Sequence, residues 1–168
     1  RLDATACLLR HGREQHVQQW QTPAYATAVP EVSVVVSLYD YADVIGATLN
    51  SIVASSDVAL EVIVVDDHAT DHSRAVASEY LADHPEVPML LVGKDANAGL
   101  AAARNTGFEL ARSAFVMVMD ADNQLYPGAL RALADRLLDE PSAAAAYCIL
   151  EDFGAASGVR SALAWDVE

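Results

Sequence analysis

The stretch VSVVVSLYDYAD at residues 32–43 runs four valines and two serines into a tyrosine-rich, acidic segment. A short apolar run of this kind is typical of a strand that is buried on both faces of a parallel sheet. Apolar residues then recur at i, i+4, i+7 and i+8 from Ile45, which is one face of a helix. The chain returns through LEVIVVD at 60–66. Strand, helix and strand in this order predict a right-handed βαβ unit.

The same alternation continues toward the C-terminus. The expected elements are a helix from Asp71 to the break at His84–Pro85, strands at 89–92, 115–119 and 143–150, and helices at about 99–112 and after Pro127. No clear period follows residue 150. We therefore expect an α/β fold in which helices flank a mostly parallel sheet.

The first 30 residues differ in texture from the rest of the chain. Residues 1–30 are polar and mixed and close with Pro23 and Pro30, so they predict a helix and a linker ahead of the main domain at 31–168. The chain starts at Arg1 without an initiator methionine. We expect it to be a segment cut from a longer protein.

Composition limits the classes of partner. The chain has 168 residues, 53% hydrophobic and 20% charged, and a net charge of -14, which disfavours nucleic acid and anionic lipid surfaces. No apolar run approaches the roughly 20 residues that span a bilayer. Cys7 and Cys148 lie far apart without CxxC spacing and predict free thiols in a reducing compartment. We expect this segment to be cytoplasmic, whether or not the longer protein associates with a membrane.

Acidic clusters follow three of the expected strands. They lie at 37–43, 66–71 and 120–123. Because ligands of open parallel sheets bind beyond the carboxyl ends of the strands, we expect the clusters to meet at one edge. Any single cluster is equally explained by helix capping and turns, but like charges gathered together favour a bound cation. Oxygen ligands point to Mg²⁺ or Mn²⁺ rather than zinc.

Four motifs carry a resemblance to a known family. They are VSVVVSLYDYADVIGATLNSI, EVIVVDDHATDHS, NAGLAAARNTGF and FVMVMDADNQLYPGAL. In this order they resemble the nucleotide-sugar-binding, N-terminal portion of a family 2 glycosyltransferase of the GT-A type, from about residue 32 to 150. The resemblance implies a GT-A fold and a sugar donor that carries a nucleotide diphosphate, most commonly uridine diphosphate (UDP).

The resemblance also implies roles for particular residues. It assigns donor binding to Ser37, Tyr39, Asp40, Asp43, Asp66, Asp67, Arg104 and Asp120. Tyr39 would stack on a uracil-like ring, and Asp43 would accept hydrogen bonds from it. Asp67 would contact the base or ribose, and Arg104 would lie near the diphosphate. Three positions depart from the usual residues, because Ser37 replaces proline, Asp40 replaces asparagine and His68 replaces glycine.

The predicted metal site is the DxD motif. Asp120 would face the ribose and sugar, and Asp122 would hold the Mg²⁺ or Mn²⁺ that bridges the two phosphates. The family transfers the sugar to an acceptor hydroxyl, on a saccharide or another molecule, with inversion. Its catalytic base belongs to a later acceptor half, which we expect to be missing from this segment, and Glu151–Asp152 comes too early in the chain to replace it.

Several alternatives compete with the transferase. A non-catalytic nucleotide-sugar-binding or scaffold module of a larger protein explains the same motifs. A receiver domain and a dehalogenase-type phosphatase place their acidic residues after other strands. A dinucleotide-binding domain needs GxGxxG after the first strand, which SLYDYAD at 37–43 lacks. His68 and His72 have i, i+4 spacing but no third ligand, so we interpret them as ordinary surface residues.

Overall fold

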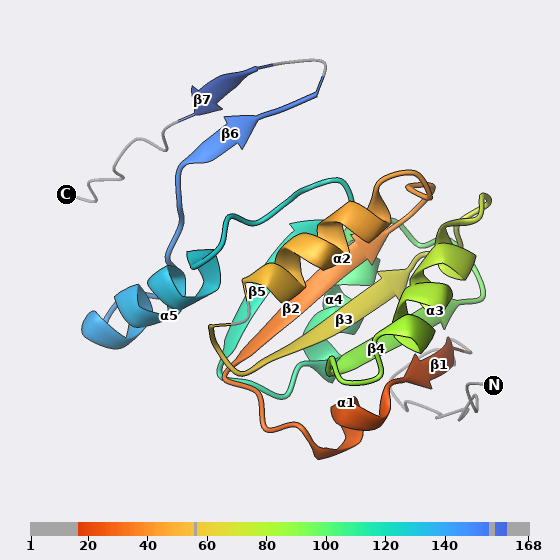
Figure 1. The fold of residues 1–168 in the computed structure, drawn as a ribbon, viewed down its shortest axis with the longest axis horizontal. Coiled ribbons are helices and arrows are strands. Elements are labelled where there is room, and N and C mark those ends of the chain that lie inside the picture. Colours follow the sequence, from red (N-terminus) through yellow and green to blue (C-terminus); the bar gives the residue numbers. More distant parts are fainter. Residues whose placement is uncertain (1–16, 56, 155–156, 161–168) are drawn as a thin grey trace.

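The structure is a computed structural model that describes residues 17–55, 57–154 and 157–160. Its elements, in chain order, are β1 (Val17–Gln21), α1 (Pro23–Thr27), β2 (Val32–Leu38), α2 (Ile45–Ala54), β3 (Leu60–Asp66), α3 (Ser73–Asp83), β4 (Met89–Lys94), α4 (Leu100–Leu110), β5 (Phe115–Asp120), α5 (Ala129–Asp139), β6 (Leu150–Asp152) and β7 (Gly158–Arg160). Figure 1 shows a twisted sheet with helices on both faces. The expected α/β class is confirmed.

A five-stranded sheet in the order β1-β4-β3-β2-β5 forms the centre. The pairs β2–β3, β2–β5 and β3–β4 are parallel, and only β1 runs antiparallel, against β4. Every residue of β2 and β3 is buried, as expected for valine-rich strands covered on both faces. The parallel arrangement brings the carboxyl ends of β2, β3, β4 and β5 to one edge, where the expected acidic clusters begin.

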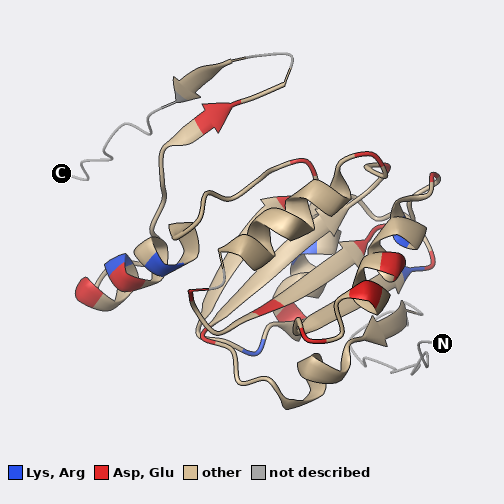
Figure 2. Cartoon of the chain, viewed as in Figure 1, with Lys and Arg blue, Asp and Glu red and all other residues tan. Residues whose placement is uncertain are grey.

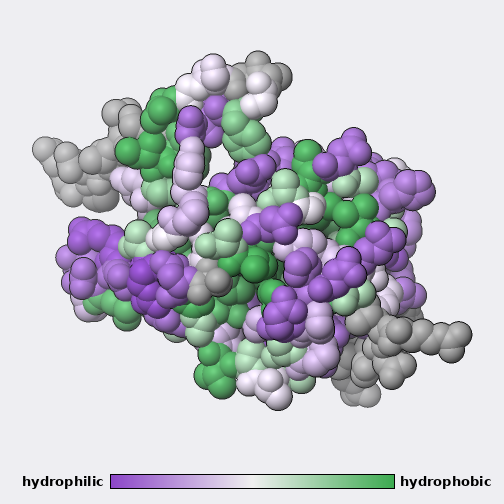
Figure 3. Space-filling model, in the orientation of Figure 1, coloured by the Kyte–Doolittle hydropathy of each residue, from purple (hydrophilic) through white to green (hydrophobic). Residues whose placement is uncertain are grey.

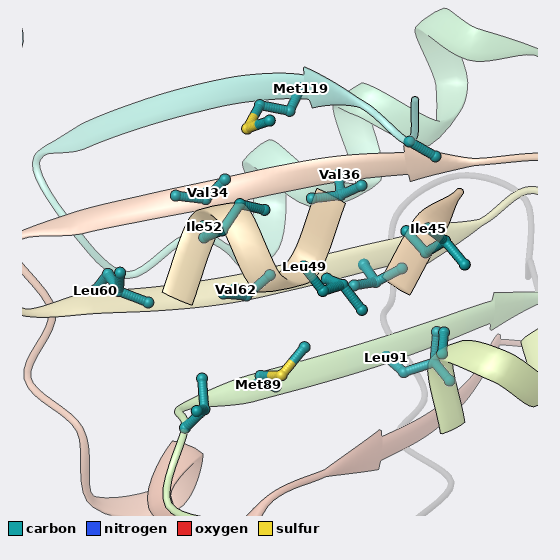
Figure 4. Packing of buried hydrophobic residues seen from close by; sticks show 14 of the residues in the cluster. Val34, Val36, Ile45, Leu49, Ile52, Leu60, Val62, Met89, Leu91 and Met119 are labelled. Atoms are coloured by element: carbon teal, nitrogen blue, oxygen red, sulfur yellow. The ribbon is translucent and has the colours of Figure 1, made fainter. Parts of the chain in front are cut away.

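The larger core lies between the sheet and the helices α2 and α3. Leu49 and Ile52 of α2 pack over Val34 and Val62 of the central strands, as Figure 4 shows. Met89, Leu91 and Met119 from the flanking strands complete this layer. The helical spacing read from the sequence therefore predicted the buried face of α2 correctly.

The opposite face of the sheet is covered by α4. Val35, Ile63 and Val65 form its core with Ala103 of the helix. Gly107 lets α4 approach closely, because a Cβ atom there would lie 2.1 Å from Cγ1 of Val35, which is well inside van der Waals contact. This close packing fixes the height of α4 above β2 and so the position of the residues at its first turn.

The N-terminal segment differs from the expected helix and linker. Residues 17–21 form the edge strand β1, in which Trp20 pairs with Leu91 of β4, and α1 is a single five-residue helix. Thr22 joins the two elements to the domain, because its hydroxyl donates to the Val87 carbonyl at 2.7 Å. The position of β1 at the edge of the sheet, where none of its residues is fully buried, explains the polar sequence VQQWQ. Residues 1–16 and Cys7 lie outside the described residues.

The prediction of a strand at 143–150 is also wrong. Residues 143–149 have no regular structure and are mostly exposed, which suits an alanine-rich run with low strand propensity. A separate two-stranded sheet, β6 paired with β7, follows it. Its neighbourhood exposes several large apolar residues, seen as green atoms at the upper left of Figure 3. No helix among the described residues is long and apolar enough to cross a membrane.

Candidate functional site

A cavity of about 340 Å³ opens at the carboxyl ends of β2, β3 and β5, beside the first turn of α4. Its lining consists of Ser37, Leu38, Tyr39, Tyr41, Asp67, Asn97, Gly99, Leu100, Ala103, Asp120 and Asp122. Figure 2 shows acidic residues in the loops that leave this edge of the sheet. Each of the three acidic clusters predicted from the sequence, at 37–43, 66–71 and 120–123, contributes at least one residue to the cavity lining.

Asp120 lies at the centre of a polar cluster. Its Oδ1 accepts a hydrogen bond from Nη2 of Arg104 at 2.7 Å and another from the hydroxyl of Ser37 at 3.2 Å. The Arg104 Nε is buried and has no hydrogen-bond partner among the described residues. Strand β5 therefore places a carboxylate in the cavity wall and β2 a hydroxyl, and α4 places a cation against that carboxylate.

Asp122 lies two residues further on, next to Tyr41 from the loop after β2. The negative charge of Asp122 raises the pKa of the Tyr41 hydroxyl, with further contributions from burial, from the charge of Asp120 and from a hydrogen bond to Asp122. The two carboxylates thus act together on one phenol. Sequence reasoning missed Tyr41, although it stands only two residues after Tyr39 in the same motif.

Asp67 forms the floor of the cavity. It is 3% exposed and pairs with Lys94, which lies 2.5 Å away and is itself 2% exposed. Its two carboxylate oxygens also accept hydrogen bonds from the amides of Ala98 and Gly99. Gly99 has a φ of 87°, a left-handed conformation that favours glycine. The NAG sequence before α4 therefore wraps around the Asp67 carboxylate.

Four residues with predicted donor-binding roles do not line the cavity. One of them, Arg104, contacts the lining residue Asp120. Asp40 turns toward the next loop and accepts a hydrogen bond from the Thr70 amide at 2.6 Å, Asp43 is exposed, and Asp66 pairs with Arg74 on the α3 side of the sheet. Asp66 and Asp67 are neighbours, so the strand geometry directs them to opposite faces. The lining residues Asn97, Gly99 and Leu100 were not predicted, although they belong to a motif that the sequence singled out.

A larger hollow, about 440 Å³, lies on the other face of the sheet beside α3. His68 and His72 line it together with Trp20 and Arg74. Arg74 is already engaged with Asp66 and with the Lys94 carbonyl. This hollow gathers fewer carboxylates than the smaller cavity, so we take the smaller cavity as the candidate site.

The Glu151–Asp152 pair lies elsewhere. Both residues belong to β6, and Glu151 accepts a hydrogen bond from the hydroxyl of Tyr126. Neither residue lines the cavity beside α4.

The cavity fits a divalent cation only in part. Asp120 and Asp122 offer carboxylate oxygens, which suit Mg²⁺ and Mn²⁺. Within the described part of the chain, no group of three or more histidine, cysteine, aspartate or glutamate side chains could enclose a metal ion. This donor set matches cations that are held by one or two carboxylates and completed by phosphate oxygens and water.

Comparison with known proteins identifies the family. Residues 33–164 match Glycosyl transferase family 2. The chain belongs to this family. One relative is the uncharacterized glycosyltransferase YibD of Escherichia coli, 34% identical over 110 residues, which are 66% of this chain and 31% of the relative. Another is the succinoglycan biosynthesis protein ExoO of Rhizobium meliloti, 35% identical over 114 residues, 68% of this chain and 32% of the relative. The chain thus spans about a third of each.

Solved structures agree with this family 2 assignment and show the GT-A fold. The mannosyltransferase PcManGT from Pyrobaculum calidifontis, in complex with GDP-Man and Mn²⁺, superposes with a TM-score of 0.54 at 32% identity, covering 63% of this chain and 31% of that one. TarS of S. aureus, in complex with UDP-GlcNAc, gives a TM-score of 0.57 at 28% identity and covers 66% of this chain and 31% of that one. The sheet flanked by helices is therefore the GT-A architecture that the motifs predicted.

Proposed function

We propose that this segment binds the nucleotide diphosphate of a sugar donor in the cavity beside α4. The observation that carries the proposal is that Tyr39, Asp120 and Asp122 line one opening at the carboxyl edge of the sheet, where Arg104 of α4 contacts Asp120. An aromatic ring, a cation and paired carboxylates are the groups that a base, a diphosphate and its counter-ion require.

Each residue has a role that follows from its place. Tyr39 is 41% exposed on the cavity wall, so its ring is available to stack on a base. Arg104 lies against Asp120 and is the cation that we propose for a phosphate oxygen. Asp67 supports the loop that carries Asn97 and Gly99, and it lines the same cavity as Tyr39. Asp40, Asp43 and Asp66 would act only by holding the loops around it.

Asp120 and Asp122 are the proposed ligands of Mg²⁺ or Mn²⁺. When bound, a divalent cation neutralises the negative charge that develops on the departing diphosphate. Arg104 contributes to the same neutralisation from the side of α4. Asp122 also acts on Tyr41, because its negative charge raises the pKa of that phenol.

The proposed reaction is transfer of the sugar to an acceptor hydroxyl, on a saccharide or another molecule, with inversion at the anomeric carbon. The hydroxyl attacks from the face opposite the diphosphate and loses its proton to a carboxylate base. All carboxylates that line the cavity, Asp67, Asp120 and Asp122, belong to the donor side of this scheme. The proposal therefore gives this segment the donor half of the reaction within a longer protein.

Two solved relatives support the choice of donor class. PcManGT was solved with GDP-Man and Mn²⁺, and TarS with UDP-GlcNAc. Both ligands are sugars joined to a nucleoside diphosphate. If the segment binds such a donor without transferring the sugar, it would serve as a binding module, which is the second function compatible with this cavity.

Titration calorimetry with nucleoside diphosphates tests the proposal. UDP, GDP and dTDP are titrated separately into the chain in the presence of Mn²⁺. We expect at least one to bind with one site per chain, and we expect UDP to bind most tightly. Failure of all three would overturn the donor-site proposal. Adding the matching nucleotide sugar and a panel of saccharides then separates transfer from binding alone.

A further inference from the structure

Lys94 is the largest charged side chain in the described core, and the proposed reaction gives it no task. It ends β4, is 2% exposed and lies on the α4 face of the sheet, two residues beyond the buried Val92. A buried ammonium is strongly unfavourable unless a counter-charge and hydrogen bonds compensate for the lost hydration. The structure must therefore gain something from keeping this charge in the interior.

The ammonium is compensated by Asp67. Its Nζ lies 2.5 Å from Oδ1 of Asp67, and no other hydrogen bond of Nζ is present among the described residues. The Lys94 carbonyl accepts a hydrogen bond from Arg74 at 3.1 Å, and Arg74 also pairs with Asp66. The two consecutive aspartates at the end of β3 thus each pair with a cation, one on each face of the sheet. Lys94 takes part in both contacts, through its ammonium and through its carbonyl.

Asp67 links Lys94 to the loop before α4 through hydrogen bonds. Its oxygens accept hydrogen bonds from the amides of Ala98, at 3.1 Å, and Gly99, at 2.7 Å. Gly99 directly precedes the first residue of α4, and Arg104 follows one turn later on the same helix. The guanidinium of Arg104 is the group that reaches Asp120.

We propose that Lys94 is a positioning residue of the donor site: through Asp67 it fixes the 95–99 loop and the first turn of α4, and so places Arg104 against Asp120. The proposal rests on the function proposed above for the cavity. The ammonium is buried beneath the cavity and is not among its lining residues, so it acts on a bound diphosphate only through these groups.

Asp67 shows why the charge is needed. Four hydrogen bonds from Lys94, Ala98 and Gly99 converge on its two oxygens, which fills their acceptor capacity. Without the ammonium, a carboxylate that is 3% exposed would keep its negative charge in the interior with two neutral amides as its only partners. It would then turn toward water, and this change releases the loop.

The test compares Lys94→Met with Arg112→Met. Arg112 is a matched control because it contacts the sheet near the amino end of β3, away from the carboxyl ends that border the cavity. Arg112 pairs with the buried Glu61, so its loss also leaves a buried carboxylate without a cation. Amide hydrogen exchange is measured for Ala98 and Gly99 with the central-strand amide of Val64 as reference, and UDP affinity is measured with Mn²⁺ present.

In Lys94→Met, we expect the Ala98 and Gly99 amides to exchange about tenfold faster or more relative to Val64, and UDP to bind about tenfold more weakly or worse. In Arg112→Met, both quantities should stay within about twofold of the wild type when compared in folded protein. Equal UDP affinity in Lys94→Met and wild type would overturn the proposal, as would an equal loss in both variants.

A replacement variant and the exchange data cover the cases in which Lys94→Met does not fold or the nucleotide does not bind. If Lys94→Met does not fold, Lys94→Gln replaces it, because the amide retains a hydrogen-bond donor to Asp67 without the charge, and the same two criteria apply. If the wild-type protein binds GDP or dTDP but not UDP, that nucleotide replaces UDP in the affinity measurement. If it binds none of the three, the donor-site proposal fails, and the exchange data still test whether Lys94 holds the loop. Slow exchange of Ala98 and Gly99 in both the wild type and Lys94→Met would show that Lys94 does not hold the loop.

Discussion

Arg104 on α4 reaches Asp120 at the end of β5, with its Nη2 2.7 Å from Oδ1 of the carboxylate. The two side chains are 35% and 41% exposed, so solvent screens the pair and it contributes little to stability. The buried Nε of Arg104 has no partner among the described residues. A cation that is held at a cavity edge without a large stabilising role is available to a phosphate.

Replacing Arg104 by methionine should separate binding from stability. We expect the free energy of unfolding to change by less than about 1 kcal/mol, because an exposed ion pair is lost. UDP affinity in the presence of Mn²⁺ should fall by about tenfold or more, because a charge-assisted phosphate contact is lost. The control is Arg131→Met on helix α5, which breaks the ion pairs of Arg131 with Glu31 and Asp135. Equal UDP affinity in both variants would refute this role for Arg104.

Tyr41 should titrate according to the charge of Asp122. Because that charge raises the pKa of the phenol, Asp122→Asn should lower it toward its ordinary value, so that tyrosinate forms at lower pH. The titration is followed by NMR of tyrosine labelled at Cζ, with Tyr41→Phe for assignment. Tyr80, whose pKa is raised first by burial, serves as the internal control and should not move. An unchanged Tyr41 titration would show that the two side chains do not interact.

Gly107 should be intolerant of any side chain. Gly107→Ala places a Cβ atom against Val35 and should cost about 1–3 kcal/mol through overpacking. The matched substitution Gly46→Ala, in helix α2, meets no atom within 4 Å and should stabilise by up to about 1 kcal/mol through helix propensity. Urea denaturation of both variants measures the difference. Similar effects at the two sites would mean that α4 does not lie this close to β2.

Asp40 should act as a loop clamp. It has a φ of 57°, and its Oδ1 accepts hydrogen bonds from the amides of Thr70, at 2.6 Å, and Asp71, at 3.2 Å. Asp40→Asn keeps an acceptor oxygen and tolerates the left-handed backbone, whereas Asp40→Ala loses both features. We expect the alanine variant to be less stable than the asparagine variant by about 1–3 kcal/mol in urea denaturation. Equal stabilities would show that the hydrogen bonds to Thr70 and Asp71 contribute nothing.

The fold was predictable wherever burial was complete. The valine runs of β2 and β3 are buried on both faces, so composition alone marks them as strands. The segment 17–21 is a half-exposed edge strand with polar residues, and its identity depends on pairing with β4, a long-range contact that local pattern does not record. The prediction of a strand at the alanine-rich run 143–149 was wrong for the opposite reason, because these residues are apolar in composition but exposed in the structure.

The site was predictable in its location but not in its side-chain directions. Parallel strands explain why the acidic clusters meet at one edge. Whether a given carboxylate faces the cavity depends on strand alternation and loop geometry, which place Asp67 in it, Asp66 on the other face and Asp40 toward Thr70. Lys94 was missed because a single lysine at the end of a strand ordinarily reaches solvent, and only the fold shows it buried.

The dependence of UDP binding on Mn²⁺ and on Asp122 tests the central claim most directly. Calorimetry compares the wild type, Asp122→Asn and the control Asp83→Asn, an exposed carboxylate at the end of α3, each with and without Mn²⁺. We predict that the wild type and Asp83→Asn bind UDP about tenfold or more tightly with Mn²⁺ than without it, and that Asp122→Asn loses this gain. Binding of UDP by Asp122→Asn that equals the wild type, metal dependence included, would contradict the account.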